Sequence, residues 1–291
     1  MNSSAATAPR VAVIVPCFND GPLAHEALRS LAQQEPTETV VVDDASTEPS
    51  TLKALTDLER SGVKVIRHDV NQGLSAARMS GLRATTAPLV FPLDADDLLV
   101  PGALTALADV IEADPGIAVA FADYEEFGTR SRVVAVPARL DAFRIAYRNQ
   151  YPVSSMFRRA ALDRVGGWRD VAGLVGYEDW HVWMTLVEHG ERGVHVGSGQ
   201  IALRRRVHGN RMLADAGRRH RELYGHLRQL HPALFAEIRQ HRRHTDVPKL
   251  PALLYPVMFG ARPPLGVWSR VLALRQIVVG DRADRHSDSY P

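Results

Sequence analysis

The first 122 residues alternate short apolar runs with longer segments of helical periodicity. The apolar runs read VAVIVPCF, ETVVVDD, VKVIRH, PLVFPLD and IAVAFAD. The first four are each followed by an amphipathic segment, at residues 22–34, 50–62, 74–85 and 103–114. Because parallel neighbouring strands need a crossover connection, usually a helix, this order predicts an α/β fold. We expect a mainly parallel sheet with helices on both faces.

After residue 122 the alternation becomes irregular, although no change of composition marks a linker. The elements expected there are strands at 132–137, 152–157 and 199–206 and helices at 179–190 and 216–230. We therefore treat residues 10–243 as one domain, with a first half at 10–122 and a second half at 123–243.

The two ends of the chain depart from this pattern. Residues 1–9 lack the charged and apolar regions of a signal peptide, and we expect a disordered lead-in. Residues 244–291 form a C-terminal extension, in which prolines should break the stretch 250–268. A helix with one apolar face should follow it, carrying Val271, Leu272, Leu274, Ile277 and Val278. We expect this helix to pack on the domain, with a membrane-surface or partner contact as the alternative.

Composition narrows the class of protein. The 291 residues are 45% hydrophobic and carry 35 Lys and Arg against 33 Asp and Glu, a balance too even for a nucleic-acid binder. The only cysteine is Cys17, so an internal disulfide is excluded and a reducing compartment is expected. No apolar run reaches the length of a transmembrane helix. We expect a cytoplasmic protein, with peripheral association at the inner face of a membrane left open.

Polar residues follow three of the expected strands, in PCFND (Pro16–Asp20), DDAS (Asp43–Ser46) and LDADD (Leu93–Asp97). Ligands of open α/β sheets bind beyond the carboxyl ends of the strands, so these residues should share one cleft. The three acids of LDADD suit Mg²⁺ or Mn²⁺, which prefer oxygen ligands. The alternative is that Asp96 and Asp97 cap the helix expected after Pro101. Neither a G-x-G-x-x-G loop nor a P-loop is present.

Four segments, in order and spacing, resemble the motifs of family 2 inverting glycosyltransferases with the GT-A fold. They are the segment beginning VAVIVPCFND, then TVVVDDAST, the segment from NQGLSAARMSG to LDADDLLVPGAL, and GYEDWHVWMTLVEHG. The resemblance covers about residues 10–210. It implies a nucleotide-sugar donor, a divalent cation and an acceptor that the sequence does not identify.

The resemblance assigns donor-binding residues in both halves of the domain. Asp44 would contact the uracil base, since an ionised carboxylate accepts a hydrogen bond from an imide N–H. Asp94 would contact the ribose or the sugar. The remaining expected donor-binding residues are Pro16, Phe18, Asn19, Arg78, Ala95 and Arg205. For Arg78 the alternative is a helix-surface arginine paired with an acid.

The resemblance also assigns the cation and the base. Asp96 would hold Mn²⁺ or Mg²⁺, with Asp94 and His208 as further ligands. Asp179 would be the general base that deprotonates the acceptor, with Glu178 as the neighbouring candidate. Adjacent helical residues point about 100° apart, so only one of the two should face the acceptor. An acidic helix N-terminus is the alternative reading of both acids.

Three aromatic residues are weaker candidates for stacking on an acceptor sugar, with a place in the core as the alternative. They are Trp168, Tyr177 and Trp180. The function expected from the whole sequence is an inverting, metal-assisted transfer of a sugar from a nucleotide sugar. A UDP-sugar is the expected donor, and GDP- and dTDP-sugars are left open. The alternatives are a sugar-1-phosphate nucleotidyltransferase and a degenerate protein that only binds a nucleotide sugar.

Overall fold

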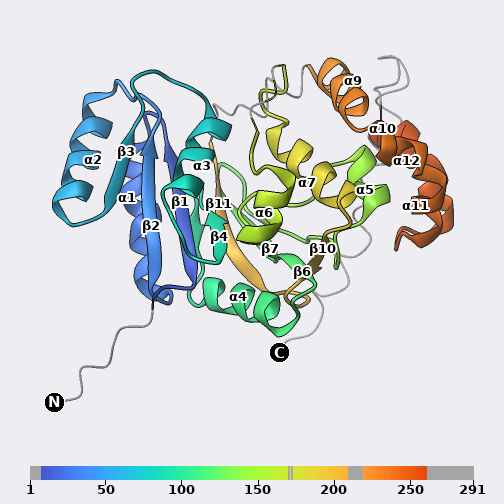
Figure 1. Cartoon of the computed structure of the whole chain (residues 1–291), viewed down its shortest axis with the longest axis horizontal. Helices are drawn as coiled ribbons and strands as arrows, with labels where there is room; N and C mark the ends of the chain where they lie inside the picture. The colour runs from blue at the N-terminus through green and yellow to red at the C-terminus, as the bar shows by residue number, and fades with distance from the viewer. Residues whose placement is uncertain (1–7, 170, 172, 209–218, 261–291) are drawn as a thin grey trace.

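The computed structural model describes residues 8–169, 171, 173–208 and 219–260, and its centre is a seven-stranded sheet (Figure 1). The strand order is β10-β6-β9-β4-β1-β2-β3. The strands are β1 (Val11–Cys17), β2 (Thr37–Asp43), β3 (Lys64–Arg67), β4 (Leu89–Pro92), β6 (Ile117–Phe121), β9 (Met156–Arg158) and β10 (Arg192–His195). All neighbours are parallel except β9, which runs antiparallel to β4 and β6. The predicted α/β class and mainly parallel sheet are confirmed.

The register of the central strands aligns their carboxyl ends. Cys17 at the end of β1 pairs with Asp43 at the end of β2, and Ile14 pairs with Pro92 at the end of β4. The loops that follow these three strands therefore leave the sheet at one edge. This is the edge at which ligands of open α/β sheets bind.

Helices cover both faces of the sheet, and the side chains of β1 alternate between them. These helices are α1 (Gly21–Ser30), α2 (Pro49–Arg60), α3 (Leu74–Arg83) and α4 (Ala103–Ala113). Val13 packs in one core cluster with residues of α1 and α4, whereas Ile14 packs in the other with residues of α3. A side chain at Gly81 would lie 2.3 Å from Cγ2 of Ile14, so glycine lets α3 approach the sheet.

A second sheet, of order β5-β11-β7-β8, joins the two halves of the domain. Its strands are β5 (Leu98–Leu99), β7 (Asp123–Gly128), β8 (Arg132–Val134) and β11 (Ile201–Val207). β11 pairs antiparallel with β5 and parallel with β7. The pairing with β5 brings the end of β11 next to the LDADD turn, which directly precedes β5.

The remaining helices lie in the second half and beyond it. They are α5 (Ala142–Tyr147), α6 (Arg159–Val165), α7 (Glu178–Glu188), α9 (His220–Leu230), α10 (Pro232–Ala236), α11 (Ile238–His244) and α12 (Lys249–Phe259). A 3-10 turn, η1 (Leu31–Gln33), follows α1. Within the described ranges, no helix has the length and apolar character that crossing a membrane requires.

The C-terminal extension differs from the prediction in one respect. Proline was expected to break the chain after residue 250, but α12 continues through Pro251 and Pro256. Pro251 lies in the first helical turn, where a backbone N–H has no partner within the helix, so its missing donor is tolerated. The apolar helix expected around residues 271–278 and most of the lead-in at 1–9 lie outside the described residues.

Candidate active site

The loops after β1 and β2 are tied together by Asn19. Oδ1 of Asn19 accepts the backbone N–H groups of Thr47 and Glu48 at 2.8 and 3.0 Å, and the backbone N–H of Asn19 donates to Oγ of Ser46 at 3.0 Å. Asn19 has a φ of 61°, a conformation that asparagine tolerates better than most residues. Asn19 therefore holds the loops after β1 and β2 in a fixed position relative to each other.

Three other residues expected to bind the donor differ in exposure. Phe18 is 46% exposed, directly beyond the end of β1. Pro16 is buried within β1, and Ala95 is also buried, at 6% exposure. Of these three, only Phe18 has an exposed side chain.

The Asp44 carboxylate is held from three directions. Its Oδ1 lies 2.7 Å from Nδ1 of His68 and accepts the N–H of Gln72 at 2.8 Å, while Oδ2 accepts the N–H of Gly73 at 2.7 Å. Nε2 of His68 lies 2.8 Å from Oγ of Ser80 on α3. The chain Asp44–His68–Ser80 fixes the orientation of the carboxylate, whose side chain is only 4% exposed. Oδ2 accepts one hydrogen bond within the protein, and a carboxylate oxygen can accept a second.

Arg78 joins the two halves of the domain at the centre of the site. It projects from α3, is fully buried, and donates from Nη2 to Oδ1 of Asp94 at 2.8 Å and from Nη1 to Oδ1 of Asp179 at 2.7 Å. Both carboxylates remain about one-third exposed, at 32% and 31% of the side chain. The alternative expected for Arg78 was an arginine on the helix surface paired with one acid. Arg78 is instead buried and is paired with two acids.

Asp179 and Glu178 diverge at the start of α7. Glu178 turns back to accept the N–H of Gly176 at 2.7 Å, whereas Asp179 reaches Arg78. Burial raises the pKa of Asp179, Arg78 lowers it and Asp94 raises it, and the net shift is upward. Burial also raises the pKa of Glu178. The carboxylate that faces Asp94 across one guanidinium is that of Asp179.

Asp97 does not cap the helix after Pro101, which corrects one alternative for the LDADD acids. α4 has Gly102 at its N-cap and receives no side-chain cap. Asp97 is buried, and its Oδ1 accepts the backbone N–H of Arg206 on β11 at 2.9 Å. Burial, followed by the charges of Asp94 and Asp96, raises the pKa of Asp97 well above its ordinary value. Asp97 therefore docks β11 on the turn.

This docking brings His208 to Asp96. Nε2 of His208 and Oδ2 of Asp96 are 3.0 Å apart, and both side chains are partly exposed. Asp20 lies nearby: burial raises its pKa, Asp96 raises it further and His208 lowers it. In the portion of the chain that the structure describes, no group of three or more His, Cys, Asp and Glu residues is arranged to hold a metal ion.

Arg205 supplies positive charge on the same side of the site. Its guanidinium lies 5.6 Å from the ring centre of Tyr124, and Nη1 is 3.4 Å from the tyrosine hydroxyl. Burial lowers the pKa of Arg205, but Tyr124, Asp97 and Asp94 together raise it above its ordinary value. Arg205 is therefore a charged group close to the LDADD turn.

Two of the three aromatic acceptor candidates belong to the core. Trp168 is fully buried, and Trp180 is 5% exposed and donates to the carbonyl of Ile145 at 2.6 Å. Neither offers a ring face to a sugar, which corrects the expectation for both. Tyr177 is partly exposed, and its hydroxyl lies 2.6 Å from Nδ1 of His220 on α9.

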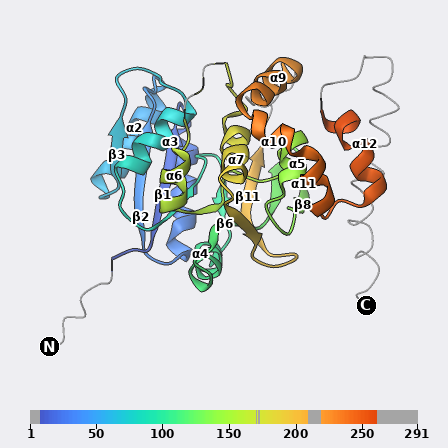
Figure 2. The same ribbon diagram turned by 45° about the vertical axis from the view of Figure 1, so that its right-hand side comes forward.

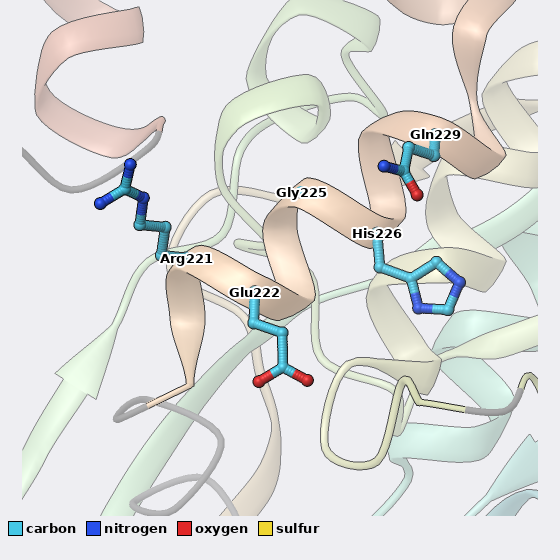
Figure 3. A pocket seen from close by; sticks show the side chains of 5 residues that line it. All are labelled: Arg221, Glu222, Gly225, His226 and Gln229. Carbon is cyan, nitrogen blue, oxygen red and sulfur yellow. The ribbon is translucent and has the colours of Figure 1, made fainter.

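An open cavity of about 640 Å³ lies along α9, close to the loop that precedes α7. It is lined by Arg221, Glu222, Gly225, His226 and Gln229. Figure 3 shows Glu222 and His226 projecting to one side of α9 and Arg221 to another. A side chain at Gly173 would lie 3.2 Å from Nδ1 of His226, so this cavity adjoins the loop that leads to Asp179.

Sequence reasoning missed two residues of the site, Asp20 and His68. Asp20 stands in the quoted PCFND run, where it was read only as part of a polar strand end. His68 is the residue after β3, a position equivalent to those of the other strand-end residues, and that position was the available signal.

Comparison with known sequences identifies the family of the chain through the first half of the domain and the beginning of the second. The sequence model described as Glycosyl transferase family 2 matches residues 12–166. An uncharacterized protein of Mycobacterium tuberculosis (strain CDC 1551 / Oshkosh), MT1568, is 30% identical over 196 residues, or 59% of this chain and 61% of that protein. An N-acetylglucosaminyltransferase of Azorhizobium caulinodans is 35% identical over 111 residues, or 36% of this chain and 28% of that protein. The chain thus spans less than two thirds of the length of these relatives.

Solved structures share the fold. S. aureus TarS in complex with UDP-GlcNAc has a TM-score of 0.65 at 20% identity, covering 93% of this chain and 81% of that chain. The mannosyltransferase PcManGT of Pyrobaculum calidifontis, in complex with GDP-Man and Mn²⁺, has a TM-score of 0.53 at 21% identity, covering 95% and 87%. At these identities the likeness supports the fold of the whole domain.

Proposed function

The chain belongs to glycosyl transferase family 2, and from this membership we propose that it transfers a sugar from a nucleotide sugar to an acceptor with inversion at the anomeric carbon. The observation that carries the proposal is the bridge from Asp94 through Arg78 to Asp179. A donor-side acid and a candidate base, 85 positions apart in sequence (179 − 94), meet there at one buried cation.

Asp179 is the general base in this proposal. The acceptor hydroxyl gives its proton to Asp179 as its oxygen attacks the anomeric carbon, and the bond from that carbon to the phosphate oxygen breaks on the opposite face. A raised pKa makes Asp179 a stronger proton acceptor, and the neighbouring Arg78 favours the ionised form that the step needs. Arg78 also holds Asp94 in place to accept hydrogen bonds from the donor.

The donor is proposed to be a UDP-sugar. The second acceptor position on Oδ2 of Asp44 suits the N–H of a uracil base, and the contacts from His68, Gln72 and Gly73 keep that carboxylate fixed. The exposed ring of Phe18 offers a surface against which a base or ribose can pack. The complex of TarS with UDP-GlcNAc is consistent with this donor class.

A divalent cation fits the pair formed by Asp96 and His208. Asp96 and His208 would hold the cation, because a carboxylate oxygen and an imidazole nitrogen are both ligands for such ions and the two side chains face each other at 3.0 Å. Diphosphate oxygens and water would complete the coordination, as is usual for Mg²⁺ and Mn²⁺. When bound, the cation would supply positive charge to the leaving diphosphate. Asp94 already accepts a hydrogen bond from Arg78, so it is the weakest candidate among the three expected ligands of the cation.

The acceptor is proposed to approach from the α9 side of Asp179. The cavity there is lined by polar and charged groups, among them Glu222, His226 and Gln229, which suit the hydroxyl groups of a saccharide. Tyr177 connects this region to the start of α7 through its contact with His220. The acceptor is thus expected to carry several hydroxyl groups.

Turnover separates this proposal from its two rivals. The protein should release UDP from a UDP-sugar in the presence of Mn²⁺, and the product should carry the opposite anomeric configuration. A nucleotidyltransferase would instead form the nucleotide sugar from a sugar phosphate and UTP. Tight binding of UDP-sugars without any UDP release, over a panel of saccharide acceptors, would support the binding-only alternative and reject our proposal.

A further inference from the structure

Helix α12 is apolar on two sides. Its inner side packs with Phe143 and Val247 in a small core cluster, to which it contributes Ala252, Tyr255, Met258 and Phe259. Its outer side carries four exposed apolar residues, which we call the outer stripe: Leu250 (71% exposed), Leu253 (58%), Leu254 (45%) and Val257 (56%). Their spacing of three, one and three residues places them on one helical face.

Specific contacts hold the inner side in place. The Tyr255 hydroxyl donates to Oε1 of Gln150 at 2.9 Å, and the Arg148 guanidinium lies 5.0 Å from the ring centre of Phe259. The outer stripe is therefore the far side of an anchored helix. A helix that is apolar all round is normally covered, and a contiguous exposed apolar patch marks an interaction site.

The segment that forms α11 and α12, after the exposed Glu237 at the N-cap of α11, is basic. Exposed cations in and beside α11 and α12 are Arg239, Arg242, Arg243 and Lys249. The only acid between residues 238 and 260 is Asp246, which is paired with Arg144 at 2.7 Å. The sequence from Val247 to Gly280 contains neither Asp nor Glu. The partner of this surface should therefore be apolar and negatively charged.

A cavity of about 400 Å³ adjoins the outer stripe at Val257. Tyr147, Phe235 and Ile238 contribute apolar walls to it, and Arg228 contributes a cation. α11 and α12 lie at the end of the molecule opposite α2, in both views of the ribbon (Figures 1 and 2). The apolar and basic features thus gather at one end of the protein.

We propose that the outer stripe and the basic residues of α11 dock the protein on an anionic lipid surface. The apolar side chains enter the boundary between headgroups and acyl chains, and the arginines contact the negative headgroups. Charge favours this occupant over a second copy, because a two-fold interface would set the same cations against one another. The residues after Gly260 add no acid before Asp281, so covering the stripe with them would not neutralise it. The proposal is independent of the transferase reaction.

Vesicle co-sedimentation of the full chain tests the proposal. The native protein should sediment with vesicles of phosphatidylcholine and phosphatidylglycerol and remain in solution with phosphatidylcholine alone. Replacing Leu250, Leu253, Leu254 and Val257 with Gln should lower the bound fraction at least about tenfold. Replacing Arg239, Arg242 and Arg243 with Gln should reduce it similarly, and added salt should weaken the binding of the native protein.

Matched controls come from the opposite end of the molecule. Leu52→Gln removes an apolar side chain on α2 that is 41% exposed, and Arg60→Gln removes a cation there whose side chain is 77% exposed. Both should bind as the native protein does, and all variants should keep its melting temperature. Native protein that stays in solution with anionic vesicles, or a stripe variant that binds equally well, overturns the proposal. A native dimer that the stripe variant converts to a monomer also overturns it.

Discussion

Nη1 of Arg78 lies 2.7 Å from Oδ1 of Asp179, a residue 101 positions later in the chain. The same guanidinium holds Asp94, so one buried cation faces two carboxylates. This arrangement links the first half of the domain, at 10–122, to the second half, which supplies the candidate base. The positive charge of Arg78 between two carboxylates affects the stability of the protein and the pKa of Asp179.

Arg78→Met should destabilise the protein by about 3 kcal/mol. The substitution leaves two partly buried carboxylates facing each other without their cation. Urea denaturation at neutral pH measures the change. Arg83→Met is the matched control: it removes an exposed arginine from the same helix and should change stability by no more than about 0.5 kcal/mol. Equal stability of the native protein and Arg78→Met would contradict the role given to the bridge.

The loss of kcat/KM at acidic pH, the acid limb of the pH profile, should occur at a pH above the ordinary pKa of an aspartate side chain. Burial raises the pKa of Asp179, and the base must be ionised, so kcat/KM should fall as pH drops through a value above about 3.9. By linkage, the raised pKa makes ionised Asp179 destabilising at neutral pH, and that effect disappears as the pH falls through the folded-state pKa. In a folded Arg78→Met, the acid limb should move to higher pH still. A limb at or below 3.9 in the native protein would exclude Asp179 as the titrating group.

His68→Ala should weaken donor binding more than it slows turnover. Without His68, Oδ1 of Asp44 keeps only the N–H of Gln72, and the carboxylate gains freedom that binding must then remove. We expect KM for the UDP-sugar to rise about tenfold, with kcat changed by less than about threefold. His189→Ala, which removes an exposed histidine bonded within its own helix, is the control. An unchanged KM in His68→Ala would refute the positioning role.

Chelation should reverse thermal stabilisation by UDP. A ligand that binds only the native state raises the melting temperature, so UDP with Mn²⁺ should stabilise the protein and EDTA should remove most of that shift. Asp96→Ala and His208→Ala should each show a smaller Mn²⁺-dependent shift than the native protein. The His189→Ala control should keep the full shift. A UDP shift that is the same with Mn²⁺ and with EDTA would argue against a cation on Asp96 and His208.

Most of the first half of the fold could be predicted because β1 to β4 are apolar runs, and an amphipathic helix follows each of them. In the second half, β8, β9, β11, α7 and α9 overlap expected elements, whereas β10 was not expected, because it is a four-residue run that includes Arg192 and His195. The strand β5, in the first half, was not expected either, because it has only two residues.

Asp44, Asp94 and Asp96 were visible in sequence because they follow strands, whereas Glu178 and Asp179 were identified only through the family resemblance. The partner of each acid could not be predicted from the sequence, because Asp97 and Asp179 each contact a segment about 100 residues away in the chain. Nor does helical spacing distinguish a buried tryptophan such as Trp180 from an exposed one.

Asp179→Asn tests the central claim most directly. Asparagine keeps the size of the side chain and an oxygen that Arg78 can reach, but it cannot take a proton from an acceptor. We predict that UDP release from the best-stabilising UDP-sugar falls at least about a hundredfold, while the thermal stabilisation by UDP and Mn²⁺ persists. Glu178→Gln, at the adjacent position, should keep most of the activity. Release by Asp179→Asn within about twofold of the native rate would contradict the assignment of the base.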